Sequence, residues 1–204
     1  ASDVYKRQGD NTGTLTISGS ENTGSINTQG GNTGGLVGQN TGTLTINDSD
    51  NTGQIQATGN KVGGLLGLNA GTSTISTTFN SGAVTGNENV GGLVGTSQGN
   101  GSLEVSNSVS LGATSGTNIN NLGGIVGSTN DTKITNSYVI CPINGCAEGN
   151  EPAPLIGTIF NNSTIETRTS TSNKTMLAST AFASAFDGKI SSEFDPVSTW
   201  NAGC

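Results

Sequence analysis

A five-residue motif of two glycines, two aliphatic residues and a third glycine recurs along this chain at nearly constant spacing. Its copies are GGLVG at 34–38, GGLLG at 63–67, GGLVG at 91–95 and GGIVG at 123–127, with a degraded copy, APLIG, at 153–157. Successive copies are 29, 28, 32 and 30 residues apart. A period held over five copies is typical of repeat architectures, in which each repeat forms one structural unit. The spacing therefore predicts about five stacked repeats.

Other positions keep the same register. One column is aliphatic: Ile17, Ile46, Ile75, Val105 and Ile134. A second is mostly glycine: Gly24, Gly53, Gly82, Gly112 and Cys141. A third is mostly aliphatic: Ile26, Ile55, Val84, Thr114 and Ile143. The segments between Asn, Gly, Ser and Asp turns are short and rich in Thr and Val, which favours strands over helices. Each repeat is thus predicted to hold three short strands.

The composition suits a thin core better than a compact one. Of the 204 residues only 30% are hydrophobic and 10% are charged, and 33 residues are glycine. A globule needs more apolar volume to offset chain entropy, whereas a solenoid fills its core with a few residues per turn. The sequence predicts an all-β fold: a parallel β-solenoid (β-helix) of about five rungs of roughly 30 residues, of either hand. We expect Ile46, Ile75 and Val84 to lie inside it.

The motifs also carry a family resemblance. GGLVG, GGLLG and GGIVG, followed by an I-x(6)-G-x-[IV] stretch, resemble GLUG-motif repeats over roughly residues 11–160. Such repeats occur in large secreted and surface proteins, including adhesins and surface proteases. The resemblance implies a β-solenoid in an extracellular or cell-surface protein, and it implies no catalytic residue.

Three parts of the chain are expected. Residues 1–10 include "ASDVYKRQ", which resembles a translated linker and is predicted to be non-native. Residues 11–160 form the solenoid, and residues 161–204 form an irregular C-terminal cap. The cap segment "TMLASTAFASAF" brings a group of large apolar side chains: Met176, Leu177, Phe182 and Phe186. We expect it to cover the last rung near Leu155 and Ile156, with helical character around 177–186.

No comparable segment precedes the first repeat. The rung around Leu15 and Ile17 is therefore expected to expose unpaired backbone groups, as any open sheet edge does. This edge would allow end-to-end association with another molecule.

Charge and cysteine content limit the partners. A formal net charge of −7 disfavours nucleic acid, and no apolar run of about 20 residues is present to insert into a membrane. Three cysteines without histidine fall short of a zinc site, and we expect neither a metal nor another cofactor. Cys141 and Cys146 bracket a PING turn and are a possible disulfide, which leaves Cys204 unpaired.

Threonines mark one candidate surface. Three consecutive repeats carry a Thr-x-Thr pair in equivalent positions, and these residues are Thr14, Thr16, Thr43, Thr45, Thr72 and Thr74. Alternation along a strand places them outward while Leu15 and Ile17 point inward. Stacked, they resemble the Thr-x-Thr face of ice-binding solenoids, although threonine is also an ordinary exposed strand residue. Ser102 and Glu104, then Asp131 and Lys133, take these places in later repeats.

Acidic and basic residues do not converge on a catalytic pattern. Glu21 and Asp50 are equivalent by repeat, but Phe79 takes the next place. Without histidine, the commonest general base is missing. The sequence thus predicts a non-enzymatic structural or adhesive segment of a larger secreted or cell-surface protein, with extracellular glycan or protein as partner. An ice-binding face is the alternative, and a polysaccharide-active β-helix enzyme is a third.

Overall fold

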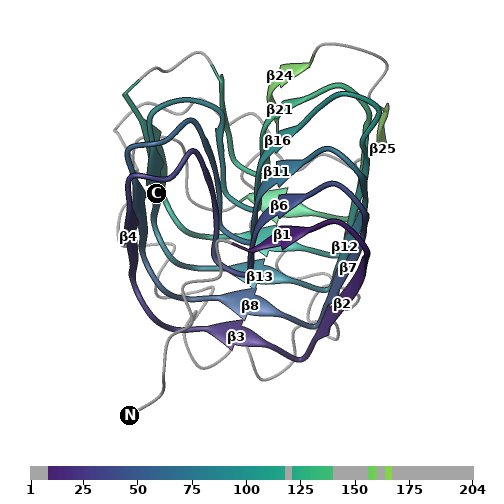
Figure 1. The fold of residues 1–204 in the computed structure, drawn as a ribbon, viewed down its shortest axis with the longest axis horizontal. Coiled ribbons are helices and arrows are strands. Elements are labelled where there is room, and N and C mark those ends of the chain that lie inside the picture. The colour runs from purple at the N-terminus through teal and green to yellow at the C-terminus, as the bar shows by residue number, and fades with distance from the viewer. Residues whose placement is uncertain (1–8, 118–120, 140–155, 160–163, 167–204) are drawn as a thin grey trace.

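The chain is wound as a parallel β-solenoid, as the sequence predicts (Figure 1). The computed structural model describes residues 9–117, 121–139, 156–159 and 164–166. Within these ranges all regular structure is β-strand, and the strand pairs β1 to β25 are parallel throughout. Each strand lies beside the equivalent strand of the next repeat, so the repeats stack as rungs.

Five parallel sheets run along the solenoid, and each is named here after its first strand. The β1 sheet contains β1 (Asp10–Asn11), β6 (Val37–Asn40), β11 (Leu66–Asn69), β16 (Val94–Ser97), β21 (Val126–Thr129) and β24 (Ile156–Ile159). The β2 sheet contains β2 (Thr14–Ser18), β7 (Thr43–Asn47), β12 (Thr72–Ser76), β17 (Ser102–Ser106), β22 (Thr132–Thr135) and β25 (Thr164–Glu166). The β3 sheet contains β3 (Glu21–Asn22), β8 (Asp50–Asn51), β13 (Phe79–Asn80), β18 (Val109–Ser110) and β23 (Tyr138–Val139).

The two remaining sheets have four strands each. The β4 sheet contains β4 (Ile26–Thr28), β9 (Ile55–Ala57), β14 (Val84–Gly86) and β19 (Thr114–Gly116). The β5 sheet contains β5 (Asn32–Gly34), β10 (Lys61–Gly63), β15 (Val90–Gly91) and β20 (Leu122–Gly123). A complete rung therefore has five strands, and the prediction of three strands per repeat is wrong. The glycine motif accounts for part of the difference, because it holds the end of one strand and the start of the next.

The register of the stack matches the sequence columns. Ile75 pairs with Ile46 on one side and Val105 on the other, and all three are fully buried. Val84, also fully buried, lies between Ile55 and Thr114 in the β4 sheet. The predicted interior positions of Ile46, Ile75 and Val84 are thereby confirmed.

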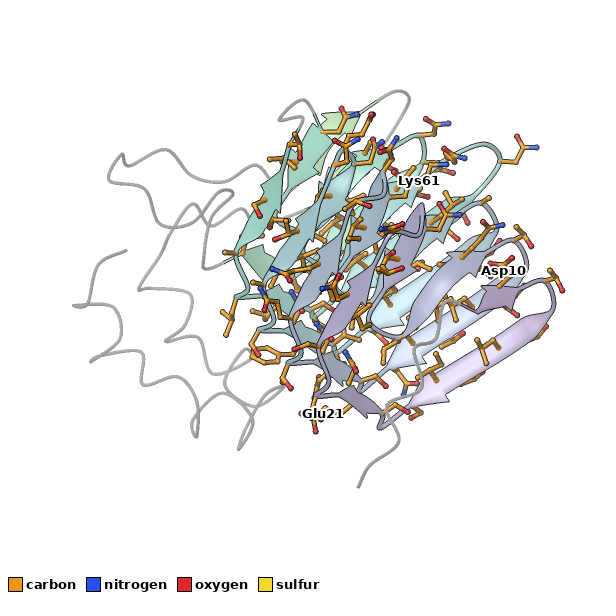
Figure 2. All side chains as sticks on the ribbon, turned by 60° about the vertical axis from the view of Figure 1, so that its left-hand side comes forward. Asp10, Glu21 and Lys61 are labelled. Carbon is orange, nitrogen blue, oxygen red and sulfur yellow. The ribbon has the colours of Figure 1, made fainter. Side chains whose placement is uncertain are left out.

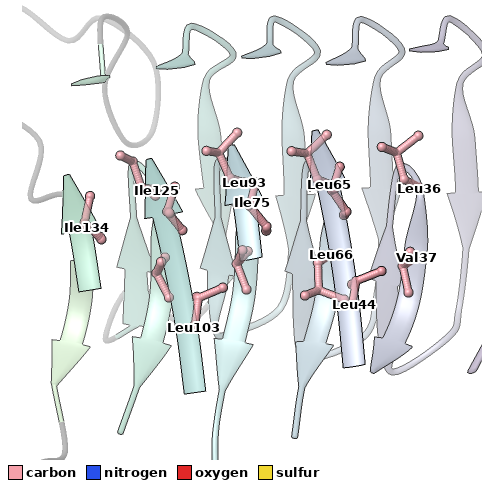
Figure 3. Close-up of a cluster of buried hydrophobic side chains, with 14 residues drawn as sticks. Leu36, Val37, Leu44, Leu65, Leu66, Ile75, Leu93, Leu103, Ile125 and Ile134 are labelled. Atoms are coloured by element: carbon pink, nitrogen blue, oxygen red, sulfur yellow. The ribbon is translucent and has the colours of Figure 1, made fainter. Parts of the chain in front are cut away.

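Buried apolar side chains form two separate clusters. The large lobe lies between the β1 and β2 sheets and is shown in Figure 3; its members are Leu36, Val37, Leu44, Ile46, Leu65, Leu66, Ile75, Leu93, Val94, Leu103, Val105, Ile125, Val126 and Ile134. The small lobe lies between the β4 and β5 sheets, and its members are Ile26, Ile55, Ala57, Val62, Val84, Val90 and Leu122. The cross-section of the solenoid is thus divided rather than filled by one continuous core.

The glycine motif causes this division. Each copy is a turn that joins a β5-sheet strand to the next β1-sheet strand and folds the chain into the middle of the rung. A Cβ on Gly64 would overlap the Gly92 carbonyl oxygen and lie 2.6 Å from Cγ of Asn80. A Cβ on Gly67 would lie 2.5 Å from the backbone nitrogen of Thr33. Only glycine allows backbone to approach backbone this closely.

Two ladders of asparagine side chains run along the axis. Nδ2 of Asn11 donates to Oδ1 of Asn40 at 2.8 Å, and Asn40 donates to Asn69 at 3.0 Å, at the corner between the β1 and β2 sheets. In the β3 sheet, Asn22 donates to Asn51 at 2.6 Å, and Asn51 donates to Asn80 at 2.7 Å. The second ladder lies under the glycine turns. Buried amides need such partners, so the ladders fix the corners and the register together.

The corner after each β2-sheet strand has left-handed backbone. The residues with positive φ there are Gly19, Asp48, Thr77, Asn107 and Asn136. Glycine, asparagine and aspartate tolerate this conformation, whereas a β-branched residue does so at a cost. Thr77, with a φ of 53°, is therefore the strained member of the column.

Several sequence-based expectations concern residues outside the described ranges. These are the leader up to residue 8, the disulfide between Cys141 and Cys146, and the cap residues Met176, Leu177, Phe182 and Phe186. The last described strand, β25, pairs with β22 and lies beyond residue 160.

Candidate binding surfaces

The predicted threonine face exists on the outer side of the β2 sheet. Thr14, Thr43 and Thr72 form one column, and Thr16, Thr45 and Thr74 form the neighbouring column. Thr45 and Thr74 are half-buried, and the other four are exposed. Equivalent threonines stand about 4.8 Å apart along the axis, because that is the spacing of paired strands. The structure therefore brings all six predicted residues together in a regular array.

The array spans three strands and then changes character. Ser102 pairs with Thr72, and Glu104 pairs with Thr74. Glu104 in turn pairs with Lys133 in the next strand. Hydroxyl and methyl groups thus give way to charged side chains on the same face, as the sequence indicates.

A polar cavity lies on a different side of the molecule, beside the glycine turns. Its volume is about 390 Å³, and it is open to solvent. The lining residues are Asn89, Thr96, Ser97, Gln98, Asn121, Ser128 and Asn130. They come from β16 and β21 on one wall and from the residues just before β15 and β20 on the other. All seven side chains are neutral amides or hydroxyls.

The cavity opens where wall side chains become small. In the first glycine turn, Nδ2 of Asn32 donates to Oε1 of Gln39 at 2.6 Å, which bridges the two walls. Leu68 takes the place of Gln39 in the next strand of the β1 sheet. Thr96 and then Ser128 follow in that column. The fall in side-chain length from Gln39 and Leu68 to Thr96 and Ser128 leaves the space.

Sequence reasoning did not find this cavity. The available signal is a pair of columns, one of which reads Asn32, Lys61, Asn89 and Asn121 and the other Gln39, Leu68, Thr96 and Ser128. Neither column suggests a site until the path of the glycine turn is known, because the turn alone decides that the two face each other.

Charged side chains are spread over the surface. Figure 2 shows Asp10, Glu21 and Lys61 well apart from one another. Glu21 and Asp50 are neighbours in the β3 sheet, and Phe79 takes the next place, as predicted. In the part of the chain that the structure describes, no group of three or more Cys, Asp or Glu side chains is placed to hold a metal ion. None of the described helical segments, had there been any, reaches the length and apolarity of a membrane span.

Comparison with known proteins gives little beyond this. No protein-family model matches the chain, and a comparison with curated proteins finds no significant match. Among solved structures, the chain is similar to a Bacteroides ovatus protein provisionally named an immunoglobulin A1 protease. The TM-score is 0.46 and the sequence identity 18%, over 75% of this chain and 49% of that one. The chain thus spans about half the length of that protein, and a likeness at this level carries no argument about activity.

Proposed function

We propose that this chain is a non-enzymatic structural or adhesive segment of a larger secreted or cell-surface protein, with GLUG-like repeats as its building unit. The observation that carries the proposal is the unbroken register of the stack: the β1 and β2 sheets each align six strands without a slip. A regular stack of this kind holds whatever precedes and follows it at a fixed separation.

The interior supports a stiff rather than a flexible spacer. Each rung is bonded to its neighbours through backbone hydrogen bonds and through the two asparagine ladders. In solenoids each repeat contacts only adjacent repeats, so stiffness depends on the interfaces between rungs. Here those interfaces combine two apolar lobes with hydrogen bonds between buried amides.

Single-molecule stretching of the chain, attached at its two ends, tests the spacer function. We expect force peaks as rungs are lost and no extension before the first peak beyond that of the attachment linkers. Gradual extension at low force, without peaks, would contradict a load-bearing role. Labelling of intact source cells with an antibody against the repeats tests the location, and signal only after permeabilisation would exclude the cell surface. Release of new reducing ends from polysaccharides would refute the non-enzymatic assignment.

The threonine array favours ice binding as a second candidate. Two parallel columns of threonine at regular spacing present hydroxyls and methyls on one exposed face. Recrystallisation inhibition at micromolar protein is expected if ice is the ligand. Replacing Thr45 by Tyr should abolish that inhibition and leave the circular dichroism unchanged, since the side chain points outward. Absence of inhibition in the unmodified protein removes this candidate.

A further inference from the structure

The polar cavity beside the glycine turns has no part in holding rungs apart. We propose that it binds neutral carbohydrate, in the form of one or two sugar residues of a glycan. This inference rests on the adhesive half of the proposed function, since it names the class of ligand that an adhesive solenoid would hold. The spacer half does not depend on it.

The lining chemistry selects for a ligand with many hydroxyl groups. Four amides and three hydroxyls face the space, and no lining side chain is charged, aromatic or aliphatic apart from the Thr96 methyl. Amides and hydroxyls both donate and accept hydrogen bonds. A ligand with closely spaced groups that also do both, as sugar hydroxyls do, can satisfy every wall of the cavity.

Part of the lining is held in place before any ligand arrives. Oγ1 of Thr96 and Oγ of Ser128 are 3.1 Å apart, and both side chains are nearly fully buried. Nδ2 of Asn121 donates to Oδ1 of Asn89 at 2.8 Å, which orients the Asn89 amide along the opposite wall. Side chains already fixed lose little further entropy on binding, so such a site is preorganised.

The mouth of the cavity offers groups that are still available. Gln98 is exposed and Asn130 is half-buried, and within the described ranges neither side-chain amide has a hydrogen-bond partner. They follow Ser97 and Thr129, the last residues of β16 and β21. A ligand seated between the walls would therefore meet two free amides above it.

The size of the cavity agrees with a short ligand. At about 390 Å³ it falls in the lower part of the range for small-molecule sites, which is about 300–1,000 Å³. It spans β16 and β21, two adjacent strands, so its length along the axis is about 10 Å or less. One or two sugar rings fit this length, and a long bound polymer would have to extend outside it.

Other ligand classes fit less well. A charged ligand would lose solvation without meeting an opposite charge, and an apolar one would cover polar groups without bonding them. An extended peptide usually binds by adding a strand to a free sheet edge. Here β15 already pairs with β10 and β20, and β16 pairs with β11 and β21, so the walls offer no free edge.

Titration of the whole chain with neutral oligosaccharides, namely maltotriose, cellotriose and mannotriose, tests the proposal by calorimetry or side-chain amide NMR. At least one is expected to bind at millimolar concentration or below and to shift the amide signals of Gln98 and Asn130. Anionic oligogalacturonate and a neutral extended peptide serve as competing ligand classes. Stronger binding of either competitor, or no binding of any neutral sugar, overturns the assignment.

The decisive variant is Thr96→Leu, because it places in β16 the residue that β11 carries at the same register as Leu68. It should weaken sugar binding at least tenfold, whereas Thr45→Leu on the threonine face should leave binding unchanged. Should Thr96→Leu melt early, the double substitution Gln98→Ala and Asn130→Ala at the mouth replaces it with the same expected loss. Equal binding by the mouth variant, or loss through Thr45→Leu, overturns the site. Failure here with intact stiffness in the stretching experiment would leave the spacer function standing.

Discussion

The two apolar lobes differ in how consistently each rung fills them. The large lobe receives an aliphatic side chain from every described β2-sheet strand of the column that runs through Ile46, Ile75 and Ile134. The small lobe has seven members, and its β4-sheet column passes from Ile26, Ile55 and Val84 to Thr114. Between the lobes lies the asparagine ladder under the glycine turns. The comparison shows that one lobe carries most of the apolar burial, while the middle of the rung is held by polar groups.

The largest effect is expected in the large lobe. Ile75→Asp places an unpaired charge between Ile46 and Val105, so the free energy of unfolding should fall by more than about 3 kcal/mol. Thr74→Asp, on the outer side of the same strand, is the matched control and should cost well under half of that. Chemical denaturation measures both. Similar losses for the two variants would mean that the strand does not have the assigned inner and outer faces.

A smaller loss is expected between the lobes. Asn51→Ala removes a donor to both Asn80 and the Gly53 carbonyl and an acceptor from Asn22, in a fully buried place. Leaving buried groups unpaired should cost about 2–3 kcal/mol. Asn27→Ala, at an exposed position in β4, is the control and should be nearly neutral. A stable Asn51→Ala variant would show that the ladder merely fills space.

The small lobe should respond with the opposite sign. Oγ1 of Thr114 is buried and has no hydrogen-bond partner within the described ranges. Thr114→Val keeps the shape and removes the unpaired hydroxyl, so stability should rise by about 1–2 kcal/mol. Thr85→Val is the control, because Oγ1 of Thr85 is 3.0 Å from Oγ of Ser115 and this bond would be lost. A drop in the melting temperature of Thr114→Val would indicate a hidden partner for that hydroxyl.

The smallest effect is expected at the corner that ends the large lobe. Thr77 has left-handed backbone where other repeats carry Gly19, Asp48 and Asn107. Thr77→Asn should therefore stabilise the chain by about 0.5–1 kcal/mol. The reverse substitution in the neighbouring repeat, Asn107→Thr, should destabilise it by a similar amount. Opposite signs in these two denaturation experiments would place the strain elsewhere.

The sequence could predict what depends on the columns alone. The repeat period placed Ile46 above Ile75, and alternation put Thr45 outside and Leu44 inside. It could not predict five strands per rung or two lobes, because both depend on how deeply the glycine turn enters the rung. That depth follows from contacts such as Gly67 against Thr33, which are distant in sequence. The polar cavity was missed for the same reason.

The parallel register of adjacent rungs is the central claim, and disulfide trapping tests it most directly. With Cys141, Cys146 and Cys204 replaced by Ser, the pair Thr45→Cys and Thr74→Cys stands on directly paired positions, about 4.8 Å apart between Cα atoms. This lies within the range that a disulfide spans. The pair Thr45→Cys and Glu104→Cys is one strand further apart, at about 10 Å, beyond that range. Under mild oxidation the first pair should close rapidly within one molecule and the second should not. Closure of the second pair alone, or of neither, would contradict the stacking.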